Sequence, residues 1–179
     1  MSQNSLNLQK CDLKQNCGEY SVMKKLNNPF VDQKGYNCFV CSPHNAVGLH
    51  LDFYLDGDVI KARWKPEDQY QGYPNVLHGG IQATLLDEVA SWAVYAVAGT
   101  GGVTSRINVQ YKKPVLIDKG EISLTAEIIE HKKRIMSMQT RLYDGKGTLC
   151  TEGVVDYYVY PEEVARAKMH YPGKETFFK

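Results

Sequence analysis

The sequence predicts an α+β domain in which one curved, mostly antiparallel sheet wraps around a single long helix. Three observations predict this fold class. Two segments of strand-like alternation precede one long apolar segment rich in alanine and leucine, and four more follow it. The later segments are joined by short connections, which favour antiparallel neighbours. The lone helix is apolar enough to be covered by the sheet.

The first two strands are predicted as a pair. Leucine and phenylalanine alternate with mostly polar side chains over residues 49–55. Asp56, Gly57 and Asp58 then form a tight turn into a second strand at Val59–Trp64. A loop rich in proline and glycine follows.

A helix of about five turns is predicted over residues 81–98. We expect Gly99 to end it, because glycine readily takes the left-handed backbone found after helix C-termini. Asp87 and Glu88 lie near the middle of this otherwise apolar run. It is therefore interpreted as a buried helix and not as a membrane span.

Strand-like alternation returns after the helix. In the second of these segments, isoleucine, leucine and alanine on one face alternate with serine, threonine and glutamate on the other. A glycine-containing turn at residues 144–147 joins the last two segments. The four predicted strands cover residues 104–111, 121–130, 134–143 and 148–160.

The two ends of the chain have weaker patterns. A short helix is expected at residues 20–26, ending before Pro29 because the residue before a proline avoids helical backbone. Pro161 is expected to open another short helix over residues 161–170. The expected parts are an N-terminal extension at residues 1–35, a folded domain at residues 36–160 and a C-terminal tail at residues 161–179.

Composition limits the classes of function. The net charge is +1 and the isoelectric point is near 7.6, so no overall field draws the chain to nucleic acid or to an anionic membrane. The five cysteines are odd in number, and no segment resembles a signal peptide. We therefore expect reduced thiols and a cytoplasmic location.

Asp87 lies on a narrow polar seam of the predicted helix. Steps of four, three and four residues place Gly80, Thr84, Asp87 and Ser91 on one stripe. A buried carboxylate costs several kcal/mol unless it is paired or hydrogen-bonded, which favours a function for Asp87. At the helix start, Gly79 and Gly80 offer backbone N–H groups to a ligand oxygen. Spacing alone is equally compatible with solvent-facing acids and an ordinary glycine loop.

Residues 73–88 resemble the signature of the PaaI-like hotdog-fold thioesterases, in which a histidine (here His78) and two glycines precede a carboxylate that follows the histidine by nine positions. Residues 102–114 resemble the family's next block, and residues 38–49 resemble an N-terminal element of some members. This resemblance, over residues 38–160, implies hydrolysis of an acyl-CoA to a carboxylic acid and free CoA, without a cofactor. It also implies a homodimer or a dimer of dimers, with active sites at the interface.

The resemblance implies roles for single residues. Asp87 would be the catalytic carboxylate, either as nucleophile or as general base for water. Gly79, or else Gly80, would supply the N–H that polarises the thioester carbonyl. His78 would orient the loop or assist the carbonyl, and Thr104 would help to position the water.

The sequence departs from the family pattern at one position. Some relatives carry asparagine or glutamine six positions before the histidine, where this chain has Gly72. Gln71 and Asn75 are candidate substitutes. Glu88, one step around the helix from Asp87, is the alternative catalytic carboxylate.

Coenzyme A carries several phosphate charges, so its site needs local cations. Lys132, Lys133 and Arg134 lie at the turn between two predicted strands. Arg134 is the strongest candidate, because a guanidinium binds phosphate through two parallel hydrogen bonds. The alternative is a solvated hairpin tip without a ligand.

Other motifs are weaker. Cys38 and Cys41 form a CxxC followed by His44, but a structural zinc site needs four ligands and the remaining cysteines are scattered. We therefore expect a turn here and no metal. Two further functions stay open on the same fold: a hydratase or dehydratase, which the paired glycines disfavour, and a non-catalytic acyl-CoA-binding module.

Overall fold

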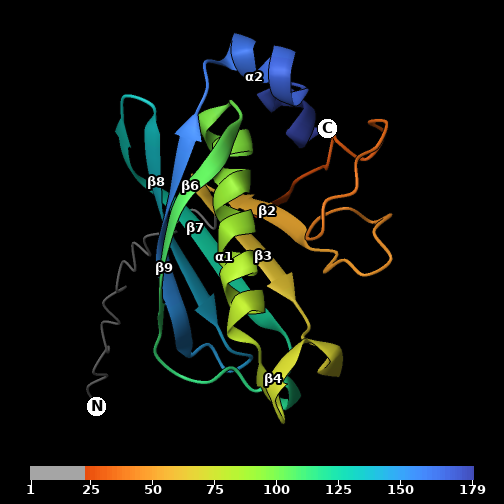
Figure 1. Ribbon diagram of the computed structural model, residues 1–179, viewed down its shortest axis with the longest axis vertical. Coiled ribbons are helices and arrows are strands. Elements are labelled where there is room, and N and C mark those ends of the chain that lie inside the picture. The colour runs from red at the N-terminus through yellow and green to blue at the C-terminus, as the bar shows by residue number, and fades with distance from the viewer. Residues whose placement is uncertain (1–22) are drawn as a thin grey trace, which may run out of the picture.

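A seven-stranded antiparallel sheet packs against one long helix (Figure 1). The computed structural model describes residues 23–179. The strands follow the order β1-β2-β3-β7-β8-β9-β6, which confirms the predicted α+β class. Their bounds are β1 Lys24–Lys25, β2 Asp52–Asp56, β3 Val59–Trp64, β6 Gly102–Tyr111, β7 Ile122–Lys132, β8 Ile135–Tyr143 and β9 Leu149–Val159.

The predicted long helix is confirmed. Helix α1 spans Gly79–Trp92 and continues as the π-helical segment η2, Ala93–Ala98. It begins two residues earlier than expected and ends at Gly99, whose φ of 76° is left-handed, as the sequence predicted. Leu85 and Leu86 are fully buried between α1 and the sheet. Burial of each such side chain stabilises the fold by about 1.5–3 kcal/mol.

The strands follow the alternation closely, and most ends agree within two residues. The clearest difference is in the first strand, where β2 begins three residues later than expected. Leu49 and Leu51 are buried as the pattern predicted, but their N–H groups donate to the carbonyls of Phe39 and Val40. They pair with a loop instead of a neighbouring strand, so their burial was predictable and their backbone partners were not.

The short helix expected at residues 20–26 is wrong in its described part. Lys24 and Lys25 form the two-residue strand β1, and the Leu26 N–H donates to the Phe53 carbonyl at 2.8 Å. The edge of β2 supplies hydrogen-bond partners that a short isolated helix would lack. The start of the expected helix lies outside the described residues.

A small hairpin before α1 was not predicted. Strands β4 (Gln71–Tyr73) and β5 (Val76–Leu77) form a separate two-stranded sheet, preceded by the short 3₁₀ helix η1 (Asp68–Tyr70). Asn75 at its turn has a φ of 61°, a backbone conformation that asparagine tolerates better than most residues. The His78 N–H donates to the Tyr70 carbonyl at 2.9 Å, so the hairpin fixes where α1 begins.

The C-terminal segment packs against the same core. Helix α2 spans Glu162–Met169 after Pro161, close to the expected bounds, and the 3₁₀ helix η4 covers Lys174–Phe178. The fully buried Phe177 ring meets the Trp92 ring edge-on. No helix within residues 23–179 is both long enough and apolar enough to cross a membrane.

Candidate active site

At the start of α1, one backbone N–H group has no hydrogen-bond partner among the described residues. His78 is the N-cap, and its Nδ1 accepts a hydrogen bond from the Gly80 N–H at 2.9 Å. The Gly79 N–H, at the first helical position, has no hydrogen-bond partner within residues 23–179. Because the N-terminal N–H groups of a helix carry partial positive charge, this donor is suited to an anionic or carbonyl oxygen.

Close packing surrounds these glycines. The Tyr111 hydroxyl donates to the Gly79 carbonyl at 2.8 Å, and the Tyr111 ring lies 3.4 Å from where a Cβ on Gly79 would be. A Cβ on Gly72 would lie 3.3 Å from the His78 imidazole. Gly72, where some relatives have an amide side chain, is thus packed against the histidine.

The candidate substitutes for that amide are engaged inside the hairpin. Gln71 Oε1 accepts from the Asn75 N–H at 3.0 Å. Asn75 Oδ1 accepts from the Asp118 N–H at 3.0 Å. Both side chains therefore hold the loop, and neither is brought to Asp87 by these contacts.

Asp87 is held by two hydroxyl groups. Its Oδ1 accepts from Thr104 Oγ1 at 2.8 Å and from the Tyr157 hydroxyl at 3.1 Å. Its Oδ2 has no partner among the described residues. Partial burial raises the pKa of Asp87, and the two hydroxyl hydrogen bonds offset part of that rise by stabilising the carboxylate. The geometry presents one fixed and one free carboxylate oxygen.

Thr104 was expected near Asp87 from the resemblance, but Tyr157 was not. Tyr157 is buried on β9 and also approaches the Asp87 carbonyl, at 3.3 Å. Seventy positions separate the two residues, and the packing of α1 against β9 brings them together. The sequence gives no local signal for that contact.

Glu88 lies in a different environment from Asp87. Its Oε1 accepts from the Trp92 indole N–H at 3.3 Å and lies 3.7 Å from Cys38 Sγ. Burial raises the pKa of Glu88 to about 8. The side chain faces the loop of Cys38 and Cys41, whereas Asp87 faces β6 and β9.

Gly79 and Asp87 are too far apart on one helix to act on the same carbonyl group. Eight residues separate them, which is about 12 Å at about 1.5 Å per residue. A donor and a base that act on one carbonyl each lie about 3 Å from it. Within one chain, therefore, the Gly79 N–H and the Asp87 carboxylate cannot both contact one carbonyl group.

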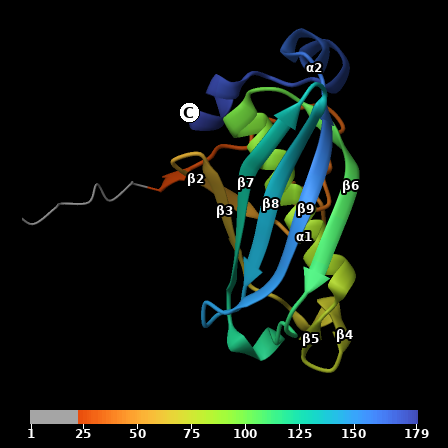
Figure 2. The same cartoon turned by 90° about the vertical axis from the view of Figure 1, so that its left-hand side faces the viewer.

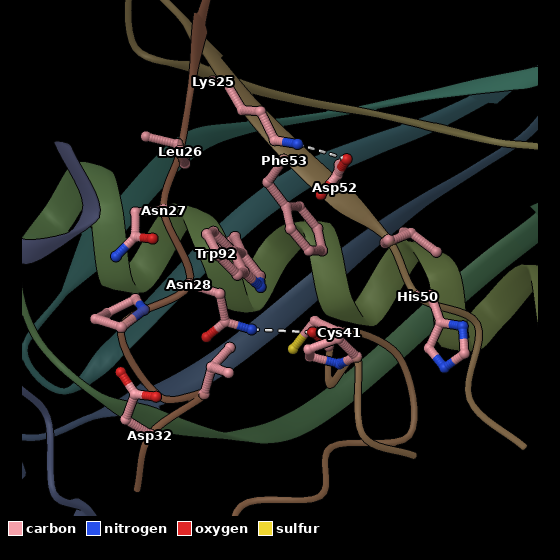
Figure 3. A pocket seen from close by; sticks show the side chains of 14 residues that line it. Lys25, Leu26, Asn27, Asn28, Asp32, Cys41, His50, Asp52, Phe53 and Trp92 are labelled. Atoms are coloured by element: carbon pink, nitrogen blue, oxygen red, sulfur yellow. Dashed lines mark hydrogen bonds and ion pairs between the residues drawn. The ribbon is translucent and has the colours of Figure 1, made fainter. Parts of the chain in front are cut away.

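The predicted cations lie at another hollow. Lys133 and Arg134 follow β7 and line, with His131 and Tyr160, a hollow of about 480 Å³ near the end of η2. Lys132 forms an ion pair with Glu130 instead. A second hollow of about 430 Å³ lies beside the loop after β1 (Figure 3). Neither hollow has Asp87 in its lining.

Comparison with known proteins supports the expected family. Residues 74–151, which contain the glycines, α1 and most of the later strands, match the model of the thioesterase superfamily. This part of the chain is therefore similar to members of that superfamily. The match includes Asp87 and Thr104, the pair joined by a hydrogen bond.

Curated members of the superfamily match over part of their length. The chain is 35% identical over 72 residues to acyl-coenzyme A thioesterase 13 of Mus musculus, covering 40% of this chain and 51% of the relative. It is 30% identical over 80 residues to acyl-coenzyme A thioesterase 13 of Homo sapiens, covering 44% and 56%. The chain thus spans about half the length of these relatives.

Solved thioesterase structures share the fold, which confirms the hotdog architecture. One thioesterase superfamily protein superposes with a TM-score of 0.62 at 25% identity, over 69% of this chain and 60% of that one. A Bacillus halodurans protein crystallised with CoA superposes with a TM-score of 0.51 at 25% identity, over 56% of this chain and 66% of that one.

Proposed function

We propose that this protein hydrolyses an acyl-CoA thioester to a carboxylic acid and free CoA, at a site that two copies of the chain build together. The observation that carries the proposal is the Asp87 carboxylate, fixed at Oδ1 by Thr104 and Tyr157 and free at Oδ2. The names of the curated relatives and the CoA bound to the Bacillus halodurans protein support this substrate class.

The free oxygen of Asp87 faces the reacting carbonyl carbon. As nucleophile it attacks that carbon and forms a mixed anhydride, which water then hydrolyses to the carboxylic acid and the free Asp87 carboxylate; as general base it takes a proton from the attacking water. In either case the carbonyl oxygen gains negative charge, the carbon–sulfur bond breaks, and the CoA thiolate leaves and is protonated. The raised pKa of Asp87 makes its carboxylate a stronger base, which favours the general-base role.

The open N–H of Gly79 from the second copy stabilises the developing oxyanion. His78 holds the Gly80 N–H and the helix start, so its role is to position this donor. The separation of about 12 Å between Gly79 and Asp87 on one helix is the reason why the donor belongs to the other copy.

Strand β6 is suited to join the two copies. It lies at the free edge of the sheet beside β9 (Figure 2) and exposes the apolar side chains of Val103 and Ile107. Antiparallel self-pairing centred on Asn108 places the bulged start of one β6, at Thr104 and Ser105, opposite Tyr111 of the other. Since Thr104 contacts Asp87 and Tyr111 contacts Gly79, this pairing brings the two halves together.

The hollow at Lys133 and Arg134 is the candidate site for the CoA phosphates. Both cations are exposed at the end of the β7–β8 hairpin, where a flexible anionic ligand can reach them. An arginine binds phosphate through two parallel hydrogen bonds, and the adjacent lysine adds charge.

Release of free thiol from a panel of acyl-CoAs tests the proposed function. We expect turnover by the wild type and loss of turnover by Asp87→Asn, with the variant still folded. Asp58→Asn is the matched control, because Asp58 is an exposed turn carboxylate remote from α1. Tight acyl-CoA binding without turnover by the wild type would instead favour a non-catalytic binding module. Unchanged turnover by Asp87→Asn would exclude the mechanism.

A further inference from the structure

The loop before β2 brings two cysteines to the face of α1 that the proposed catalysis does not use. Cys38 and Cys41 are free cysteines with their Sγ atoms 3.1 Å apart. Glu88 Oε1 lies 3.7 Å from Cys38 Sγ, and the three ligand atoms all lie within 4.8 Å of one another. Fifty positions separate Cys38 from Glu88, so no local sequence pattern groups them.

We propose that Cys38, Cys41 and Glu88 bind a zinc ion, with a water molecule as the fourth ligand. Thiolate pairs favour zinc over calcium or magnesium, and a carboxylate oxygen is an accepted third ligand. In a tetrahedral zinc site, bond lengths of about 2.3 Å to sulfur and about 2.1 Å to oxygen place neighbouring ligand atoms about 3.6–3.8 Å apart. The 3.7 Å between Cys38 Sγ and Glu88 Oε1 already fits this range, and the two sulfur atoms, 3.1 Å apart, must separate by about 0.7 Å.

The backbone around Cys38 is arranged to stabilise a thiolate. The N–H groups of Val40 and Cys41 both point at Cys38 Sγ, each at 3.3 Å. Successive backbone N–H groups directed at one atom form an anion-binding concavity. This second observation is independent of the distances between the ligand atoms.

Outer partners orient the other two ligands. The Tyr36 hydroxyl lies 2.8 Å from Cys41 Sγ, and the Trp92 indole N–H donates to Glu88 Oε1. Asn28 Nδ2 in turn donates to the Cys41 carbonyl at 2.9 Å and to the Tyr36 hydroxyl at 3.0 Å (Figure 3 shows the first bond). Such outer contacts fix ligand orientation in metal sites.

The fourth position opens into a cavity. A hollow of about 240 Å³ is lined by all three ligands, with Tyr36 and Ser91 among its other residues, so a water molecule has room beside the ion. Zinc binding requires both thiols and the Glu88 carboxyl group to be deprotonated, and any protons that they carry are released to solvent. Two thiolates and one carboxylate then leave a net charge of −1 around Zn²⁺.

Metal content and cobalt spectroscopy on the full chain test the site. Protein purified under reducing conditions without chelator is expected to contain about one zinc per chain. After chelator treatment and reduction, added Co²⁺ is expected to give thiolate-to-cobalt charge transfer and the visible bands of a tetrahedral ion. Added zinc should raise the thermal unfolding midpoint of the stripped protein.

Three variants identify the ligands. Cys38→Ser, Cys41→Ser and Glu88→Gln are each expected to weaken metal binding by at least about tenfold. The matched control is Cys150→Ser, because Cys150 is buried in β9 outside the cluster. The double variant Cys11→Ser/Cys17→Ser is also expected to keep the metal.

Several results would overturn the proposal. One is reduced wild-type protein that binds neither zinc nor cobalt, including the case in which the untreated protein carries a Cys38–Cys41 disulfide. Another is equal metal loss in Cys150→Ser or in Cys11→Ser/Cys17→Ser. If a cysteine variant does not fold, as judged by circular dichroism, the wild-type cobalt spectrum decides: absence of thiolate charge transfer excludes the cysteines as ligands.

Discussion

Replacing Gly79 with proline deletes one hydrogen-bond donor with little other change. Gly79 is the first residue of α1, a position where proline is favoured because its fixed φ fits the helix. His78 has φ −57° and ψ 134°, the extended backbone that a residue before proline requires. The deleted N–H has no partner within residues 23–179, so no internal hydrogen bond is lost.

We expect Gly79→Pro to lower kcat strongly and to change the free energy of unfolding only slightly. Removal of one oxyanion donor typically lowers kcat by about 10²–10³-fold, or about 2.7–4 kcal/mol of transition-state stabilisation. Gly79→Ala is the matched control, because it adds a Cβ 3.4 Å from Tyr111 but keeps the N–H. We expect it to stay within a few-fold of wild type. Equal activities of the proline and alanine variants would refute the assignment of this donor.

Mixing two inactive variants tests whether the site is shared. Gly79→Pro and Asp87→Asn each disable one half, so a mixed dimer retains one intact site of two. Random pairing of equal amounts makes half of the dimers mixed and restores about a quarter of wild-type activity. The assay is thiol release from the co-expressed mixture; mixed dimers isolated from it through two different tags should have about half of wild-type activity. Absence of any recovery, with mixed dimers demonstrated, would contradict a site built from two chains.

Three further predictions concern other parts of the molecule. Thr104→Val removes a hydrogen bond that lowers the pKa of Asp87, so the acidic limb of the rate–pH profile should move to higher pH; an unmoved limb would exclude this coupling. Ile107→Lys places a charge on the exposed edge of β6 and should give monomers with little activity in light scattering and thiol release. Leu86→Ala should lower the free energy of unfolding by about 2–5 kcal/mol in urea titrations, with the exposed Val47→Ala near zero.

Local patterns predicted most of the fold. The apolar run of α1, its glycine stop and the alternation of β7, β8 and β9 are properties of neighbouring residues, and their positions were predicted closely. The N-terminal strand β1 was missed because its partner edge on β2 lies about 30 residues away along the chain. The hairpin at residues 71–77 has too few residues for a clear alternation.

The candidate site was predicted only in part, for the same physical reason. Asp87 stood out because a carboxylate inside an apolar helix is costly, and Thr104 followed from the family resemblance. Tyr157 reaches Asp87 through the packing of α1 on β9, and Cys38 reaches Glu88 through the packing of its loop on α1. Neither contact could be predicted from a local sequence pattern. Glu88 and Asp87 face different sides of α1: Glu88 faces the loop of Cys38, and Asp87 faces Thr104 on β6.

The two edge strands of the sheet differ in their capacity to pair with another strand. At one end, β1 has only two residues, both exposed lysines, which is too short and too charged to template another strand. At the other end, β6 offers ten residues. If one edge of a sheet cannot pair, another strand can be added only at the other edge. Two-fold pairing through β6 would cover that edge, so no free edge would remain for further strands to add as in a fibre. We therefore expect the two exposed lysines of β1 to disfavour edge-to-edge association on that side.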